Sequence, residues 1–391
     1  MTIPITATEL QVLVSHEAPG SLSFYLPTHR AGFETQQNAI RFKNLLARAE
    51  EKLIEGGLKR AAVEARLRPL HAFLGDGRFW QNQLDGLAVF FGLAEPVIYR
   101  LPLRLPELVS VGSHYYLKPL LPLLGRNVPF HILALGQGSV RLFKANRFHI
   151  REITPAEMPH KAEDVTEYYE TERIQQWHTM TPQAGPKHAR SAIFHGHGVG
   201  RTDARGEKKR LAEFCSQVHG GVRKALEGGQ GPLVLAAIEP LLGLYRGLNN
   251  SPFLEEEVIN RFPENLRPEE LRQLAWPLVE HHYEEAFKAD SAKYNELAET
   301  GLATADLAKV VSAAHTDQID RLFVSVDDQA WGTFDEQGWS TEIHEQYQSG
   351  DRDLLDLAAI RAFLGGSTIY PCRRHELPAD SSVAATLRFK T

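Results

Sequence analysis

Short apolar runs alternate with amphipathic helical segments along this sequence, and Gly or Pro turns separate them. In the first third, residues 21–26 and 86–92 are strand-like, and the apolar residues from Ile40 to Ile54 follow helical spacing. The last third continues the pattern with helix 304–314, strand 319–326, helix 353–364, strand 368–371 and a final strand at 383–389. This alternation predicts an α/β fold of mixed α+β type.

The 391-residue chain is too long for one ordinary compact core, so it is expected to form several domains. A proline-rich stretch through Pro119, Pro122 and Pro129 is typical of a domain boundary, and the last third begins near Ser251-Pro252. We predict three domains. They are an N-terminal α/β domain (1–125), a central domain with a Gly/His-rich basic loop and a long helix (126–250), and a C-terminal domain (251–391).

Composition excludes several classes of protein. Hydrophobic residues make up 43% and charged residues 24% of the chain, which is unlike a collagen, low-complexity or mainly disordered sequence. We see no membrane-spanning run of about 18 apolar residues and no secretory signal. The two cysteines, Cys215 and Cys372, cannot form a disulfide framework, and we interpret Cys215 as a packed thiol. We expect a cytoplasmic protein.

The net charge of −6 hides a strong asymmetry along the chain. Residues 187–210 contain seven basic and two acidic residues, a local +5, and residues 41–68 have a local +4. Residues 251–300 contain twelve acids and five basic residues, a local −7. Two basic regions and a third, acidic region favour the approach of a phosphate backbone in one orientation, although such charge runs are also typical of solvated helix faces.

The most informative segment is 179–202, which shows no apolar period. Loops of this length inside a compact domain are usually functional or disordered. Gly196, Gly198 and Gly200 let backbone amides approach a ligand closely, and a helix is expected to follow from Asp203 to Leu226. This combination predicts an anion or phosphate site. It is neither a P-loop nor a dinucleotide fingerprint, because no strand runs into it and no Gly-Lys-Ser/Thr follows.

Histidine pairs occur at two places, and neither predicts a metal site. His195 and His197 form a His-x-His pair that lacks a third ligand at a recognisable spacing. His281 and His282 lie with Glu285 on the predicted acidic helix, and we interpret them as part of a solvated face. No Gly-x-Ser-x-Gly elbow is present, so a hydrolase of that class is not expected. We expect no metal and no cofactor.

The order of these parts resembles the peptide-chain release factor and Pelota superfamily. The closest resemblance is to its bacterial relatives, the bacterial archaeo-eukaryotic release factor-like families. The matching features are Ser23-Phe24-Tyr25-Leu26-Pro27-Thr28 with helix 38–53, the strand pair from Phe130, the His-Gly-x-Gly loop before a basic helix, and the ending 317–326 then 384–389. The resemblance covers nearly the whole chain. It implies an N-terminal α/β domain, a central domain with a catalytic loop, and a C-terminal α/β/α sandwich like ribosomal protein L7Ae.

The loop departs from the superfamily pattern and is degenerate. Members that hydrolyse peptidyl-tRNA read His-Gly-x-Gly-Gly-Gln, whereas residues 195–198 match and Val199 and Gly200 replace the final Gly-Gln. The glutamine that positions water is therefore missing. Residues 228–230 do spell Gly-Gly-Gln, but they follow the long helix, and we interpret them as a helix C-cap and turn. The Asn-Ile-Lys-Ser motif for stop-codon reading is also absent.

The resemblance implies a ribosome- or tRNA-associated factor that acts in translation termination or ribosome rescue. His195 or His197 could act as a general base if the protein hydrolyses peptidyl-tRNA without the glutamine. The predicted RNA-binding residues are the basic residues and glycines of the loop and the following helix, namely Lys187, Arg190, Gly196, Gly198, Gly200, Arg201, Arg205, Lys208 and Lys209.

Two alternatives remain open. The chain could be a hydrolase or nuclease that acts on a phosphate-bearing substrate through the same His/Gly loop. It could also be a noncatalytic adaptor whose acidic helix and C-terminal domain bind a protein partner, as the corresponding superfamily domain binds its GTPase. The predicted partners are thus a ribosome or tRNA-like RNA and, through the C-terminal domain in the adaptor alternative, a protein, with no membrane association.

Overall fold

The computed structural model describes residues 7–92, 95–126, 128–165, 204–227, 231–248, 251–348 and 350–389. The chain forms two compact units: unit 1 combines Met1–Asn127 with Glu284–Thr391, and unit 2 is the continuous segment Val128–Tyr283. The division into domains 1–125, 126–250 and 251–391 stays a prediction. Within the described residues, no helix is both long enough and apolar enough to cross a membrane.

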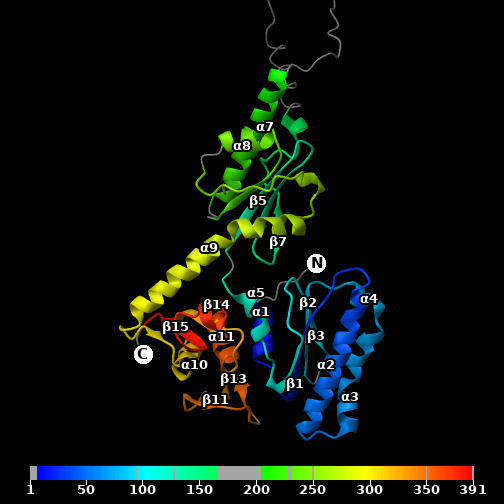
Figure 1. Cartoon of the computed structure of the whole chain (residues 1–391), viewed down its shortest axis with the longest axis vertical. Helices are drawn as coiled ribbons and strands as arrows, with labels where there is room; N and C mark the ends of the chain where they lie inside the picture. The colour runs from blue at the N-terminus through cyan, green and yellow to red at the C-terminus, as the bar shows by residue number, and fades with distance from the viewer. Residues whose placement is uncertain are drawn as a thin grey trace, which may run out of the picture. The chain divides into compact units, whose positions relative to one another are not determined.

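The N-terminal part of unit 1 is a four-stranded antiparallel sheet in the order β3-β2-β1-β4, and helices α2 and α3 cover one face of it (Figure 1). Its elements are α1 (Ala7–Val14), β1 (Glu17–Pro27), α2 (Thr35–Glu55), α3 (Arg60–His71), η1 (Ala72–Gly75), α4 (Gly77–Gln81), β2 (Gly86–Phe91), β3 (Val97–Leu101), β4 (Leu108–His114), η2 (Lys118–Leu120) and α5 (Leu121–Leu124). Side chains alternate along β1, so Phe24 packs with Phe42 of α2, while Tyr25 faces the opposite side with Phe90. Both faces of this sheet are therefore buried.

The C-terminal part of unit 1 is built on a second sheet, in the order β14-β10-β15-β9. Its elements are β9 (Ala303–Thr304), α10 (Leu307–His315), β10 (Ile319–Ser325), β11 (Trp331–Asp335), β12 (Ser340–His344), β13 (Arg352–Asp353), α11 (Leu354–Leu364), β14 (Thr368–Cys372), η4 (Arg374–Glu376) and β15 (Val383–Leu387). Strands β10 and β14 are parallel, and β15 is antiparallel to β10. Strands β11, β12 and β13 form a separate small sheet.

Helices cover both faces of this second sheet. Leu322 of β10 packs with α10 and α11, whereas the next residue, Phe323, faces the end of helix α9 (Pro268–Leu297). The Phe323 ring stacks on Tyr370 with 5.0 Å between centroids, and Phe287 of α9 meets Phe323 edge-on at 5.6 Å. The mixed α/β fold class predicted from the sequence is therefore confirmed.

The two parts of unit 1 share one hydrophobic core. It contains Tyr25 and Phe90 from the first sheet together with Leu322, Leu355 and Ile360 from the second sheet and α11. A shared core makes the two parts cooperative although unit 2 separates them in the sequence.

A buried ion pair lies at this shared core. The Nζ atom of Lys118 is 3.3 Å from Oδ2 of Asp353, and the two side chains are only 2% and 0% exposed. Lys118 also donates to the backbone carbonyl of Asp328. Asp353 caps α11, because its side chain accepts from the Leu355 N–H at 3.0 Å. The pair thus connects η2 of the N-terminal part to the start of α11.

A second carboxyl group, Asp356, is buried one turn further along α11. Burial and the nearby Asp353 carboxylate raise its pKa to about 7, while the Leu117 N–H donates to it at 3.1 Å. Because the pKa in the folded state lies above the unfolded value, the protonated form is favoured by folding. The resulting stabilisation is complete below about pH 4 and is lost as the pH rises through about 7.

We therefore expect Asp356→Asn to stabilise unit 1 at pH 7.5 relative to the wild type, and to have little effect near pH 4. The upper limit of the difference is roughly 4 kcal/mol, since each pKa unit corresponds to about 1.4 kcal/mol. Asparagine keeps an acceptor for the Leu117 N–H. Urea unfolding at both pH values checks this, with the exposed Asp380→Asn as the control. An equal effect of Asp356→Asn at pH 4 and pH 7.5 would contradict it.

Unit 2 contains a four-stranded sheet in the order β7-β6-β5-β8, with helices on both faces (Figure 1). Its elements are β5 (Phe130–Leu135), β6 (Val140–Ala145), β7 (Ile150–Ile153), α7 (Ala204–Leu226), β8 (Leu233–Ala236), α8 (Leu241–Leu248), η3 (Pro263–Asn265) and the first part of α9. Strands β5 and β8 are parallel, and β6 is antiparallel to both β5 and β7. Leu133 and Leu135 pack under α7 and α8, whereas Phe130 and Ile132 pack against Leu271 of α9 on the other face.

Candidate functional site

Most residues of the predicted loop site lie outside the described residues. These are Lys187, Arg190, His195, Gly196, His197, Gly198, Gly200 and Arg201, and the Gly-Gly-Gln tripeptide at 228–230 lies outside them as well. Of the predicted RNA-binding set, the structure describes the helical backbone at Arg205 and the side chains of Lys208 and Lys209. The candidate site can therefore be built only from its described base, helix α7.

Helix α7 confirms the helix predicted to run from about 203 to 226. Its apolar residues recur at helical spacing, with Leu211, Phe214, Val218 and Val222 buried against the sheet. Phe214 is 1% exposed and Val218 is fully buried, so the middle of the helix is firmly anchored. This anchoring fixes the direction in which the beginning of the helix points.

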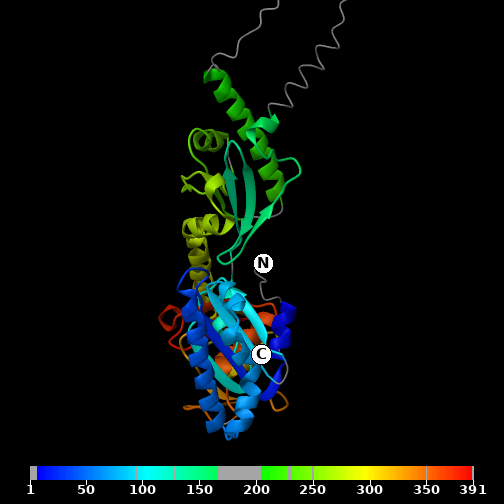
Figure 2. The same ribbon diagram turned by 90° about the vertical axis from the view of Figure 1, so that its right-hand side faces the viewer.

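The first described turns of α7 carry its positive charge. Residues 206–210 are all exposed, and they include Lys208, Lys209 and Arg210 with the single acid Glu207. Figure 2 shows this end of α7 extending beyond the strands of the unit 2 sheet. Exposed basic side chains on a projecting helix can contact a phosphate backbone without distorting the core beneath.

The other basic region, residues 41–68, forms α2 and α3, and much of its charge is used locally. Arg41 donates to the Pro27 carbonyl at 3.1 Å, and Lys52 donates to the Val109 carbonyl at 3.2 Å. Arg66 donates to the Gly20 carbonyl at 2.9 Å. These contacts attach the helices to the sheet, which favours the interpretation of this region as a largely structural, solvated face.

Cys215 lies on α7 and is a packed thiol, as predicted. It is fully buried, and burial raises its pKa to about 11, so the thiolate needed for nucleophilic chemistry is strongly disfavoured. The neighbouring ring of His219 meets Tyr245 of α8 edge-on at 5.9 Å between centroids. Burial and then Arg223 lower the pKa of His219, which makes it a neutral packing residue at neutral pH.

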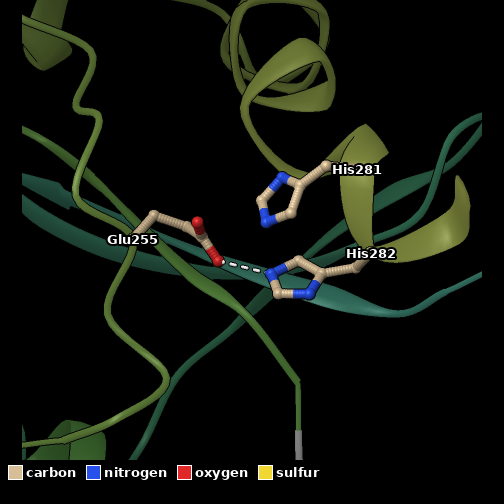
Figure 3. A group of neighbouring side chains, drawn as sticks. All are labelled: Glu255, His281 and His282. Atoms are coloured by element: carbon tan, nitrogen blue, oxygen red, sulfur yellow. Dashed lines mark hydrogen bonds and ion pairs between the residues drawn. The ribbon is translucent and has the colours of Figure 1, made fainter. Parts of the chain in front are cut away.

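The surroundings of the histidine pair on α9 differ from those expected from the sequence. His281 is exposed, but His282 is only partly exposed, and its Nε2 lies 2.8 Å from a carboxylate oxygen of Glu255 (Figure 3). The acid beside the pair is therefore Glu255, from the segment after α8, and not the helix neighbour Glu285. Sequence spacing carried no signal for this contact, because Glu255 and His282 are 27 residues apart.

Comparison with known structures finds proteins of the release factor and Pelota type. The archaeal translation termination factor aRF1 shares 15% identity over 98% of this chain and 99% of its own, with a TM-score of 0.24. Pelota from Archaeoglobus fulgidus shares 12% identity over 99% and 93%, with a TM-score of 0.31. A model of ribosome-bound archaeal Pelota and ABCE1 shares 8% over 100% and 96%, with a TM-score of 0.37.

Two sequence comparisons complete the assignment. No curated protein sequence matches the chain. The family described as Bacterial archaeo-eukaryotic release factor family 3 matches residues 129–318, nearly half of the chain, which includes the sheet of unit 2, α7 and α9. This stretch contains two of the features that carried the resemblance, namely the strand pair from Phe130 and the His-Gly-x-Gly loop before a basic helix. Residues 129–318 are thus similar to the Bacterial archaeo-eukaryotic release factor family 3.

Proposed function

We propose that this protein is a ribosome- or tRNA-associated factor that acts in translation termination or ribosome rescue. The observation that carries the proposal is the exposed basic beginning of α7 within the stretch that matches the release factor family. In the sequence, this helix directly follows the Gly/His-rich basic loop. RNA phosphates would contact Lys208 and Lys209, and the loop glycines would allow a close approach of the backbone.

Chemistry on peptidyl-tRNA is a further part of the proposal. The glutamine of the hydrolysing members is replaced by Gly200, so water would have to be activated by another group. A histidine is suited to this role, because its usual pKa is close to neutral pH. In this proposal, His195 or His197 is the general base, and Arg201 and Arg205 hold the phosphates. The C-terminal part of unit 1 would bind a protein partner.

The experiment is co-sedimentation with ribosomes over a series of salt concentrations. Lys208→Gln with Lys209→Gln is expected to weaken binding and to reduce the slope of log K against log salt by up to about 2, because two phosphate contacts are lost. The control is the double variant Lys288→Gln with Lys309→Gln, which removes two exposed helical lysines from unit 1. Equal salt slopes for the two double variants would contradict a role of α7 in RNA binding.

Release of peptide from peptidyl-tRNA is measured on the same samples. Release that disappears in the double variant His195→Ala, His197→Ala, with co-sedimentation retained, supports the histidine-loop hydrolase. Binding without release by the wild-type protein identifies a noncatalytic ribosome-associated factor. Turnover of a phosphate-bearing substrate without ribosomes, together with no co-sedimentation at low salt, would replace the translation proposal with a hydrolase or nuclease.

A further inference from the structure

Three side chains of unit 2 that are suited to metal binding lie together near the surface. One nitrogen each from His281 and His282 and one carboxylate oxygen of Glu255 all lie within 4.8 Å of one another. Figure 3 shows both imidazole rings directed toward the carboxylate, and the two ring centroids are 4.0 Å apart. Zn²⁺ binds histidine nitrogen and carboxylate oxygen at about 2.0–2.2 Å, so small side-chain rotations are enough to enclose an ion.

The backbone holds the carboxylate ligand in place. The segment that carries Glu255 runs parallel to β8, with bridges from Leu254 to Leu233 and from Ile259 to Ala236. The Glu255 N–H donates to the Leu233 carbonyl at 2.9 Å. The Glu255 side chain is only 14% exposed, so its carboxylate has limited freedom to turn away from the histidines.

The two histidines are held by the packing of α9. Val279, two residues before His281, is 1% exposed in the core between α9 and the sheet, together with Leu271 and Ala275. Ligands on rigid elements lose little freedom when an ion binds, which favours binding. One ligand thus comes from a strand-like segment beside the sheet and two come from a packed helix.

The charge around the group also favours a cation. Glu256 and Glu257 follow Glu255 directly, and Glu280 and Glu284 flank the two histidines on α9. A segment with this excess of acids creates a negative potential that attracts divalent ions. By itself, such a potential binds no particular ion, whereas imidazole nitrogens discriminate in favour of transition metals over Mg²⁺ and Ca²⁺.

We propose that Glu255, His281 and His282 form a binding site for a zinc-type divalent transition-metal ion. Three protein ligands leave a fourth tetrahedral position open, and the exposure of His281 places that position toward solvent. The ion would link the segment after α8 to α9 and so stabilise unit 2. This inference is independent of the proposed RNA-binding function, because none of these side chains belongs to α7 or to the loop.

The test is a calorimetric titration of the chelator-treated full chain with ZnCl₂, in the background of His195→Ala with His197→Ala, which removes the other histidine pair. Glu255→Gln, His281→Ala and His282→Ala are each expected to weaken binding at least about tenfold, as the loss of a ligand removes a metal bond. The control His375→Ala removes an exposed histidine of unit 1 and is expected to bind Zn²⁺ like the parent protein.

A second measurement separates binding from folding. Zn²⁺ is expected to raise the melting temperature of the parent protein and to raise that of Glu255→Gln less, because the stabilisation of the native state depends on the affinity for the ion. Co²⁺ in place of Zn²⁺ is expected to give visible absorption bands that disappear in Glu255→Gln. Zn²⁺ affinity that is the same in the parent and in all three variants would overturn the site, and so would the absence of Zn²⁺ binding by the parent.

Discussion

Replacing Lys118 with Met is expected to destabilise unit 1 by about 3–5 kcal/mol, because the buried carboxylate of Asp353 loses its cation. The Asp353 side chain is 0% exposed, so water cannot take the place of the ammonium group. The Asp328 carbonyl would lose its donor as well. Amide hydrogen exchange checks this expectation, since the amides of α11 and β4 should exchange faster while those of β5 in unit 2 serve as an internal reference.

A double variant distinguishes the effect of the lost ion pair on stability from the effect of lost packing. Lys118→Met with Asp353→Asn removes both charges, and asparagine can still accept the Leu355 and Ala330 N–H groups that Asp353 now caps. We expect it to be more stable than Lys118→Met alone. The exposed Lys309→Met serves as the matched control. A loss of unit 1 stability below about 1 kcal/mol in Lys118→Met would contradict this prediction, because it would show that the Asp353 carboxylate keeps a compensating partner.

Phe214→Ala is expected to cost about 3–5 kcal/mol of the stability of unit 2, because truncation leaves a cavity between α7 and the sheet. Phe214 is 1% exposed and packs in the same cluster as Leu133, Val218 and Tyr245. Urea unfolding followed by hydrogen exchange of the β5 and β6 amides is the measurement.

The same helix supplies the control. Gln217→Ala changes an exposed position three residues away and is expected to alter the stability of unit 2 by less than about 0.5 kcal/mol. If α7 carries the RNA-binding surface, Phe214→Ala should also weaken ribosome co-sedimentation, since the basic turns would lose their fixed direction. A stability loss as small as that of Gln217→Ala would contradict the packing described for α7.

Local patterns predicted much of the fold. Strand β2 and strand β5, which begins at Phe130, occur where the apolar runs predicted strands, and α7 occurs where the sequence predicted a helix. These elements bury most of their apolar residues, so burial leaves a clear periodic signal in the sequence. The hairpin of β11 and β12 was missed, because its strands are mainly exposed and mostly polar.

Contacts between distant segments had no such signal. The ion pair of Lys118 and Asp353 joins residues 235 positions apart, and Glu255 meets His282 across 27 positions. Periodicity reports which face of an element is buried, but it does not report which other element covers that face. For this reason, the sequence pattern places His282 on a solvated helix face, and it does not predict the shared core of unit 1.

The position of β15 determines the order in which the parts of this chain can fold during synthesis. This strand lies inside the second sheet, between β10 and β9, and that sheet shares its core with the N-terminal strands. Nascent chains generally fold their completed parts first. Unit 2 is a continuous segment, so it can fold while it emerges from the ribosome. The N-terminal sheet instead lacks part of the core around Tyr25 and Phe90 until the C-terminal part of unit 1 has been translated, so this face stays incompletely buried for most of the synthesis of the chain.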